Sequence, residues 1–197
     1  MIRKSAALLC AFLLTACMGG SRSSSDVALY DLGPPASVLA GAATASTGVA
    51  IEIRLPGWFD ATNMAYRLAY QDSQRLFSYT QARWAGAPAT LLQQRLRQRL
   101  GVVSGGATCT LRLELDEFSQ VFSAASQSTA LIQGEALMLG KARSLLARQT
   151  VRIEVPAGRD AAAGALALSA ATDALAKQLL PLLEQNSTGC RPLAAAN

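Results

Sequence analysis

Reactive side chains are few in this sequence, and cysteine carries most of the chemistry that they could perform. The 197-residue chain has four cysteines and no histidine. Without imidazole, Ser-His and Cys-His nucleophilic dyads and histidine metal sites are excluded. Asp116 and Glu117 are the nearest pair of carboxylates, but neighbours on a strand point to opposite faces and cannot share one substrate. We therefore expect no enzymatic activity, no cofactor and no metal.

Cys17 ends a segment with the proportions of a secretory signal. Arg3 and Lys4 precede the apolar run 6–14, which is too short to cross a bilayer, because a span needs about 20 residues. The residues LTAC at 14–17 resemble the bacterial lipobox, in which the cysteine thiol receives a diacylglyceryl group and cleavage leaves an acylated N-terminus. The resemblance implies a lipoprotein anchored at Cys17. The alternative is an ordinary signal peptide with an incidental cysteine.

The residues after Cys17 predict a short tether. Residues 18–25 are dominated by glycine and serine, a composition typical of flexible coil, and eight residues reach at most about 28 Å. Met18, in place of Asp, follows the cysteine, which by resemblance to Gram-negative sorting signals favours the outer membrane, with the folded part facing the periplasm. No later stretch looks apolar and unbroken enough to cross a membrane.

Length and charge place the rest of the chain in a single domain. We expect a signal peptide at 1–16, an acylated N-terminus and tether at 17–26, one domain at 27–185 with a low-complexity surface loop at 36–48, and a tail at 186–197. Without Arg3 and Lys4, 16 basic residues face 13 acidic ones, a net charge of +3 that gives no argument for nucleic-acid binding. No phosphate-binding GxxxxGK[ST] loop is present, so the chain is not an ATPase motor.

Cys109 and Cys190 remain once Cys10 leaves with the signal and Cys17 is acylated. An even pair in an oxidising compartment favours a disulfide, which would tie the tail to the start of a central strand. Closing so long a loop would stabilise the fold by about 4 to 5 kcal/mol in the chain-entropy model. The alternative is two separate thiols.

Hydrophobic periodicity predicts the elements. Alternating apolar runs bounded by turn residues predict strands at 27–32, 49–56, 64–70, 74–84, 110–122, 129–139 and 144–155. Leucines spaced four apart predict a helix from Pro88 to Gly101, and an Ala-rich pattern predicts a second helix over 160–180, limited by Pro181. On its wet side, Asp173 and Lys177 are spaced to pair. The expected fold class is α+β, a mostly antiparallel or mixed sheet with two helices on one face.

The order of several short patterns resembles the family of ABC-type transport auxiliary lipoproteins. These patterns are YDLGPP, IRLPGWFD, AYRLAY, LFSYTQARWAGAPATLLQQRLRQRL, LRLELDEF and the Ala-rich final helix. The chain departs from the family at 134–139, where a Trp-containing strand is common, and at 85–90, where an acidic-polar segment is common. The resemblance implies a non-catalytic accessory of an MCE-domain transporter that moves phospholipid or similar lipids between membranes. It also implies an MCE-domain partner, and a homo-oligomeric ring matched to a ring-shaped MCE protein is a reasonable expectation.

Two groups of residues are candidates for contact with a partner or with lipid headgroups. Trp58 and Phe59 follow a strand in the expected loop PGWFD, although aromatic residues in such loops often cap a core instead. Arg95 and Arg99, with Arg97, lie on the first long helix, where a solvated face is the alternative.

A different function stays open. A structural assembly factor or pilotin-like lipoprotein of another envelope machine would share the same anchor and domain, and would differ only in its partner. An enzyme is the third hypothesis.

Overall fold

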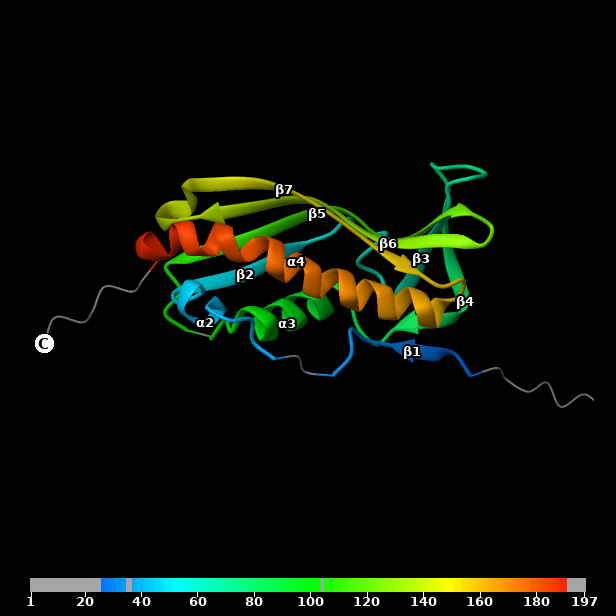
Figure 1. Ribbon diagram of the computed structural model, residues 1–197, viewed down its shortest axis with the longest axis horizontal. Coiled ribbons are helices and arrows are strands. Elements are labelled where there is room, and N and C mark those ends of the chain that lie inside the picture. Colours follow the sequence, from blue (N-terminus) through cyan, green and yellow to red (C-terminus); the bar gives the residue numbers. More distant parts are fainter. Residues whose placement is uncertain (1–25, 35–36, 104, 191–197) are drawn as a thin grey trace, which may run out of the picture.

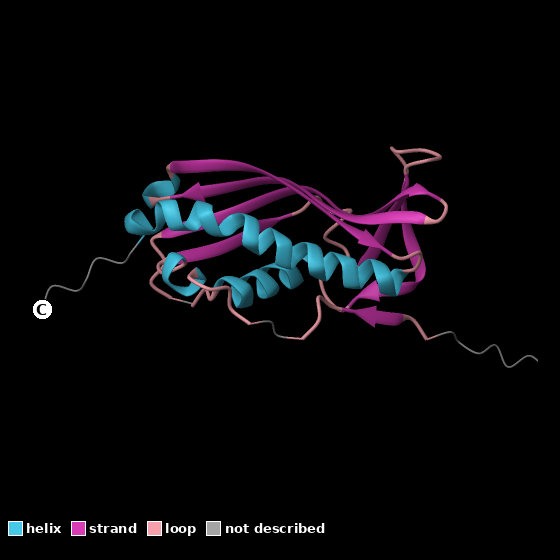
Figure 2. Cartoon of the chain, in the orientation of Figure 1, coloured by secondary structure: helices cyan, strands magenta, loops and turns pink. Residues whose placement is uncertain are grey.

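A computed structural model describes residues 26–34, 37–103 and 105–190 of the chain (Figures 1 and 2). The elements in chain order are β1 (Ala28–Tyr30), α2 (Ala42–Ala45), β2 (Val49–Arg54), β3 (Asn63–Leu68), β4 (Leu76–Trp84), α3 (Pro88–Leu100), β5 (Cys109–Ala124), β6 (Gln127–Leu139), η1 (Lys141–Arg143), β7 (Leu145–Ala157) and α4 (Ala161–Cys190). The helices α2, α3 and α4 lie together along one side of a long, twisted sheet. The fold is α+β.

The sheet is mixed, which corrects the expectation of a mostly antiparallel one. The antiparallel meander β5–β6–β7 forms as predicted, and β3 and β4 form a hairpin. However, β1 runs parallel to β4, and both β2 and β3 run parallel to β5. The long strand β5 makes this possible: β6 covers the whole of one edge, while β2 and β3 share the other edge end to end. Hydrophobic alternation reports which residues face the core, and it carries no information about strand direction.

A bulge in β5 determines which of its residues face the helices. Leu115 lies opposite Gly134 and Glu117 lies opposite Gln133, so Asp116 is left without a cross-strand partner. Inward-facing positions therefore change parity, from odd numbers before the bulge to even numbers such as Phe118 after it. Gly134 is required here, because its φ is 153° and a Cβ would lie 2.2 Å from the carbonyl oxygen of Glu114.

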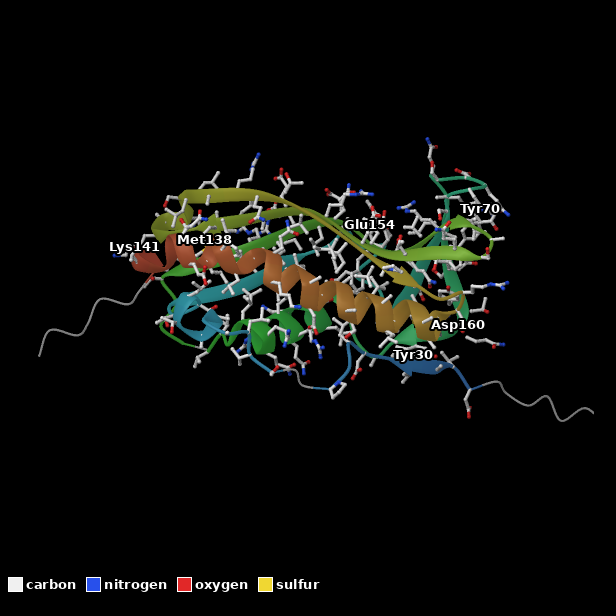
Figure 3. The ribbon with its side chains drawn as sticks, in the orientation of Figure 1. Tyr30, Tyr70, Met138, Lys141, Glu154 and Asp160 are labelled. Carbon is white, nitrogen blue, oxygen red and sulfur yellow. A yellow bond between two sulfur atoms is a disulfide. The ribbon has the colours of Figure 1, made fainter. Side chains whose placement is uncertain are left out.

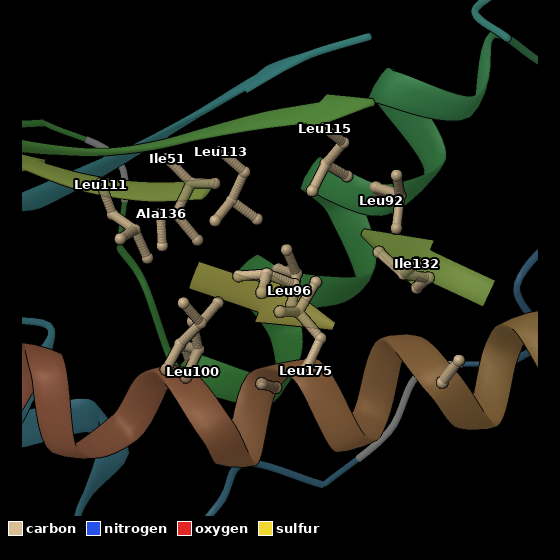
Figure 4. Close-up of a cluster of buried hydrophobic side chains, with 14 of the residues drawn as sticks. Ile51, Leu92, Leu96, Leu100, Leu111, Leu113, Leu115, Ile132, Ala136 and Leu175 are labelled. Atoms are coloured by element: carbon tan, nitrogen blue, oxygen red, sulfur yellow. The ribbon is translucent and has the colours of Figure 1, made fainter. Parts of the chain in front are cut away.

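The core lies between the sheet and the helices (Figure 4). Leu111, Leu113 and Leu115 of β5 are 0 to 2% exposed and face the helices. In α3, the predicted leucine stripe is fully buried, Pro88 occupies the first turn, and Gly101 ends the helix with a φ of 63°. In α4, the predicted stripe is also buried, at Leu168, Ala171, Leu175 and Leu179.

The helices differ from the predicted pair in number and extent. The described residues contain four helical segments, because α2 and η1 join the two expected helices. The first of these, α2, lies within residues 36–48, a segment predicted to be a surface loop. Ala42 and Ala45 are buried, and α2 packs against α3 and α4. Small residues made this segment look like low-complexity coil, but they are also what allows a short helix to approach two longer ones closely.

Pro181 does not end α4, which continues to Cys190. The missing backbone N–H of a proline costs a helix one hydrogen bond. Burial of Leu182 and Leu183 and the covalent attachment of Cys190 hold the last turns in place. Ala161–Asn186 is long and apolar enough to cross a membrane by length and composition, contrary to expectation, but half of its most apolar stretch is buried inside the protein. Here it serves as the central helix of the core.

Charged side chains cover the sheet face that looks away from the helices. Arg112 Nε lies 3.1 Å from Glu52 Oε2, and Arg54 Nη2 lies 2.8 Å from Glu52 Oε1. Burial raises the pKa of the Glu52 carboxyl, but the hydrogen bonds from Arg54 and Arg112 lower it by more, so this pKa lies below its ordinary value. Charged groups therefore occupy this part of the face, and the main core cluster lies on the other side of the sheet.

Candidate functional site

The loop PGWFD between β2 and β3 is held in a fixed conformation. The backbone N–H groups of Phe59 and Asp60 donate to the carbonyl oxygen of Pro56, at 2.8 and 3.0 Å. The carboxylate of Asp60 accepts a hydrogen bond of 2.8 Å from the backbone N–H of Ala89, in the first turn of α3. This cap satisfies a free N–H group of the helix and places a negative charge at its positive end. The loop is thus fastened both to itself and to α3.

The two aromatic residues of this loop have opposite environments. Phe59 is 1% exposed, and the Arg67 guanidinium carbon lies 5.8 Å from the centre of its ring. Arg67 in turn forms an ion pair of 3.0 Å with Glu117. Trp58 is 65% exposed, although its ring centre is only 6.4 Å from that of Phe59. Phe59 is therefore buried beside Arg67, outside the main core cluster, whereas Trp58 projects into solvent from a rigid base.

The candidate arginines of α3 are engaged within the protein. Arg95 donates through Nε and Nη2 to the two carboxylate oxygens of Asp173 in α4, at 2.8 and 2.9 Å. Arg99 Nε lies 3.3 Å from the same carboxylate. Both arginine side chains are 11% exposed. Arg95 Nη1 also donates to the backbone carbonyl of Pro34, and Arg99 Nη1 donates to that of Ser37.

These contacts give both arginines a structural role. They join α3 to α4 and to the segment that leads from β1 to α2. Asp173 faces the arginines, and its predicted partner Lys177 on the same helix is not what it contacts. An interhelical pair with two hydrogen bonds prevailed over the i, i+4 pair that the sequence suggested.

Cys109 and Cys190 form a disulfide across a sequence separation of 81 residues. Both cysteines are buried, and the hydroxyl of Thr108 donates to the carbonyl oxygen of Cys190. The bond ties the end of α4 to the start of β5. Cys17, the expected lipidation site, lies outside the described residues.

A buried polar network was missed by the sequence interpretation. The hydroxyl of Tyr79 donates to Gln120 Oε1 at 2.8 Å, and Gln120 Nε2 donates to Ser128 Oγ at 2.9 Å and to the carbonyl oxygen of Gly158 at 2.7 Å. Gln120 is 1% exposed. The sequence signal that could have predicted this network is Gln120 itself. Its amide occupies an inward-facing position between Phe118 and Phe122, and a buried amide needs hydrogen-bond partners.

This network has no obvious catalytic chemistry, and within residues 26–34, 37–103 and 105–190 no group of three or more Cys, Asp or Glu side chains is arranged to hold a metal ion. Exposed Trp58 on a rigid loop is a feature suited to contact with another molecule.

The sequence matches the family described as the ABC-type transport auxiliary lipoprotein component over residues 30–179. The chain belongs to this family. The resemblance noted in the sequence is thereby confirmed, and the family is one of transport auxiliary components. As lipoproteins, its members belong to the cell envelope.

Solved structures share the fold. A Xanthomonas campestris protein assigned to the family DUF330 superposes with a TM-score of 0.70 at 17% identity, covering 81% of this chain and 99% of that one. A second crystal structure, of an uncharacterized protein, superposes with a TM-score of 0.61 at 12% identity, covering 80% of this chain and 99% of that one. No curated protein matches the chain significantly.

Proposed function

We propose that this protein is a non-catalytic auxiliary component of an MCE-type transporter that moves lipids between the two membranes of a Gram-negative envelope. Acylated Cys17 anchors it to the outer membrane, and the domain docks an MCE-domain protein at the outer-membrane end of the lipid path. The family match supports a role in transport, and the lipobox LTAC with Met18 supports the anchor.

The observation that carries the docking role is the exposure of Trp58 on a fixed loop. Ordering a flexible loop on binding would oppose association, whereas a loop already held by Pro56, Asp60 and buried Phe59 loses little freedom. Large aromatic residues at the centre of an interface commonly provide most of its binding energy. Trp58 is therefore the expected anchor of the partner contact, and Arg95 and Arg99 support it only indirectly by fixing α3.

Copurification of the MCE-domain protein with a tagged chain tests this proposal. Trp58→Ala removes the exposed ring and is expected to weaken the association by at least about tenfold without changing stability. Tyr70→Ala is the matched control, since Tyr70 is also an exposed aromatic residue, 43% exposed on the turn between β3 and β4. Equal recovery of the partner with both variants would contradict docking through Trp58.

The oligomeric state is part of the same proposal. A ring of copies would match the symmetry of a ring-shaped MCE partner, because closed rings form through repeated head-to-tail contacts. Light scattering of the acylated protein in detergent is expected to give a mass several times that of one chain, and a monomeric mass would rule the ring out. Capture of other envelope machinery in place of an MCE protein would favour the pilotin-like alternative.

A further inference from the structure

Large apolar side chains are exposed where the chain enters the domain. Leu29 of β1 is 68% exposed, Leu166 of α4 is 75% exposed, and Val27, directly before β1, is 47% exposed. Leu29 and Leu166 line one open hollow of about 620 Å³, together with other residues of β1 and α4, the segment after β1, and Arg95 of α3. Two elements distant in sequence thus present apolar side chains side by side.

A second hollow extends this surface. It has a volume of about 480 Å³, shares Tyr30 and Ala162 with the first, and adds Tyr79 and Arg159. Leucines beside tyrosines and an arginine are the composition of surfaces that lie at a membrane boundary, where aromatic and basic side chains contact headgroups and aliphatic ones reach the acyl region. We call Val27, Leu29, Tyr30, Arg159 and Leu166 the entry surface.

Two acidic groups near the entry surface, Asp31 and Asp160, are used for local structure, whereas Asp26, directly before Val27, is exposed. Asp31 Oδ1 accepts a hydrogen bond of 2.8 Å from the backbone N–H of Gly33, and Asp160 Oδ1 accepts one of 2.8 Å from that of Ala163, at the start of α4. Figure 3 shows Tyr30 and Asp160 close together at one end of the elongated molecule, with Met138 and Lys141 at the other end. The entry surface therefore occupies one tip of the protein.

The length of the preceding chain limits how far this tip can lie from the membrane. Ten residues lead from Cys17 to Val27, and a chain extends by at most about 3.5 Å per residue, so the distance is at most about 35 Å. We propose that the entry surface rests on the bilayer that holds the acyl chains of Cys17, with Leu29 and Leu166 inserted among the headgroups. The proposal rests on acylation of Cys17 and goes beyond docking to a transporter, because it concerns a different contact of the protein, with the membrane.

Such a contact would orient the domain. Acyl chains alone allow the domain to rotate about the tether, whereas insertion of two leucines adds apolar burial at one tip and holds the long axis away from the membrane plane. The far end of the molecule, where Lys141 lies, would then project away from the bilayer.

Depth-dependent fluorescence quenching tests this contact. The acylated full-length protein would be reconstituted in vesicles of phosphatidylethanolamine and phosphatidylglycerol, with a single environment-sensitive dye on Leu29→Cys or Leu166→Cys. Val103→Cys is the matched control: Val103 is 82% exposed and lies beside Val49 and Ala107, at the far end from β1. Lipid-borne nitroxides are expected to quench the dye at 29 and 166 at least about twofold more than at 103.

Several results would overturn the proposal. Equal quenching at the three positions, with the protein floating with the vesicles, would show an anchored domain that does not rest on this surface. A protein without acyl groups by mass spectrometry would remove the anchor and the proposal together. A photo-cross-linker at position 29 that captures protein and not lipid in native envelopes would assign the surface to a protein partner. None of these results depends on whether Trp58 binds an MCE protein.

Discussion

Arg95 of α3 donates hydrogen bonds to both carboxylate oxygens of Asp173 in α4, with N···O distances of 2.8 and 2.9 Å. Arg99, one turn further along α3, lies 3.3 Å from the same carboxylate. Planar guanidinium groups match a carboxylate in this geometry, so the pair fixes the two helices in register as well as in distance. The two arginines and Asp173 thus form the joint between the two long helices.

Asp173→Asn should destabilise the protein by about 2 to 3 kcal/mol, because it leaves two largely buried arginines without their counter-charge. Chemical denaturation measures the change in the free energy of unfolding. Arg148→Gln is the control, since Arg148 is 60% exposed and pairs with Glu135 at 3.5 Å on the solvated sheet face. A loss no larger than the control's would contradict the structural role assigned to the joint.

Removal of the disulfide should cost about 4 to 5 kcal/mol in the chain-entropy model, since the bond closes a loop of 81 residues. Denaturant midpoints with and without reductant measure this cost. The double variant Cys109→Ala/Cys190→Ala should unfold at the lower midpoint under both conditions. If reductant leaves the wild-type midpoint unchanged, the bond contributes nothing to stability.

Gly134→Ala should destabilise the protein by more than about 2 kcal/mol. An added Cβ would lie 2.2 Å from the Glu114 carbonyl oxygen and 2.6 Å from the Leu115 Cα, and backbone atoms in a central strand cannot move aside. Gly57→Ala is the control, because a Cβ there meets nothing within 4 Å. Thermal unfolding of the two variants compares them directly, and similar melting temperatures would argue against the bulge geometry at Asp116.

The Tyr79 hydroxyl should give the protein a distinctive alkaline stability profile. Burial, with smaller effects from Tyr66 and Asp160, raises the pKa of Tyr79 to about 12 from 10.0. A raised pKa means that the folded state holds the proton more tightly. Its contribution to stability is therefore complete below pH 10 and is lost as the pH rises toward 12.

Tyr79→Phe removes this titration. Its free energy of unfolding should consequently fall less between pH 10 and pH 12 than that of the wild type, although it starts lower because Gln120 loses a hydrogen bond. Denaturation series at stepped pH provide the comparison. Parallel curves for the two proteins would show that Tyr79 ionises as freely as in the unfolded chain.

Substitutions of Trp58 and Phe59 should change the stability of the protein by different amounts, although the two residues are neighbours in the sequence. Phe59→Ala empties a buried site and should cost about 3 to 5 kcal/mol, whereas Trp58→Ala should change stability by less than about 0.5 kcal/mol. Urea denaturation monitors both, with the fluorescence of buried Trp84 as the remaining tryptophan signal in Trp58→Ala. Equal losses would mean that Trp58 is also part of the packed interior and is not available to a partner.

Local patterns predicted the elements but not their pairing. The leucine spacing in α3 and the alternation in β5 are direct consequences of one buried face, so they are legible in the sequence. The parallel contacts of β2 and β3 with β5 join segments tens of residues apart, and no local pattern specifies which strands meet. The same limit explains Pro181, whose unfavourable position in α4 is tolerated because distant residues hold the helix on both sides.

For a related reason, the sequence identified the candidate contact residues but could not predict which of them are exposed. PGWFD was recognisable as an aromatic loop. Which of Trp58 and Phe59 is buried depends on the backbone conformation of the loop, and the hydrogen bond from α3 to Asp60 helps to fix that conformation. The pairing of Arg95 and Arg99 with Asp173 was likewise not predictable, because a charged helix face looks solvated in the sequence until the helix that packs against it is known. Composition identified the charged groups, and tertiary packing determined which of them form contacts within the protein.

Cross-linking in living cells, followed by mass spectrometry of what the acylated protein captures from its native envelope, tests the proposed function most directly. We expect an MCE-domain protein among the captured partners, with cross-links that include the loop bearing Trp58. Capture of other envelope machinery without any MCE-domain protein would leave the fold and the family standing and would contradict the role in lipid transport.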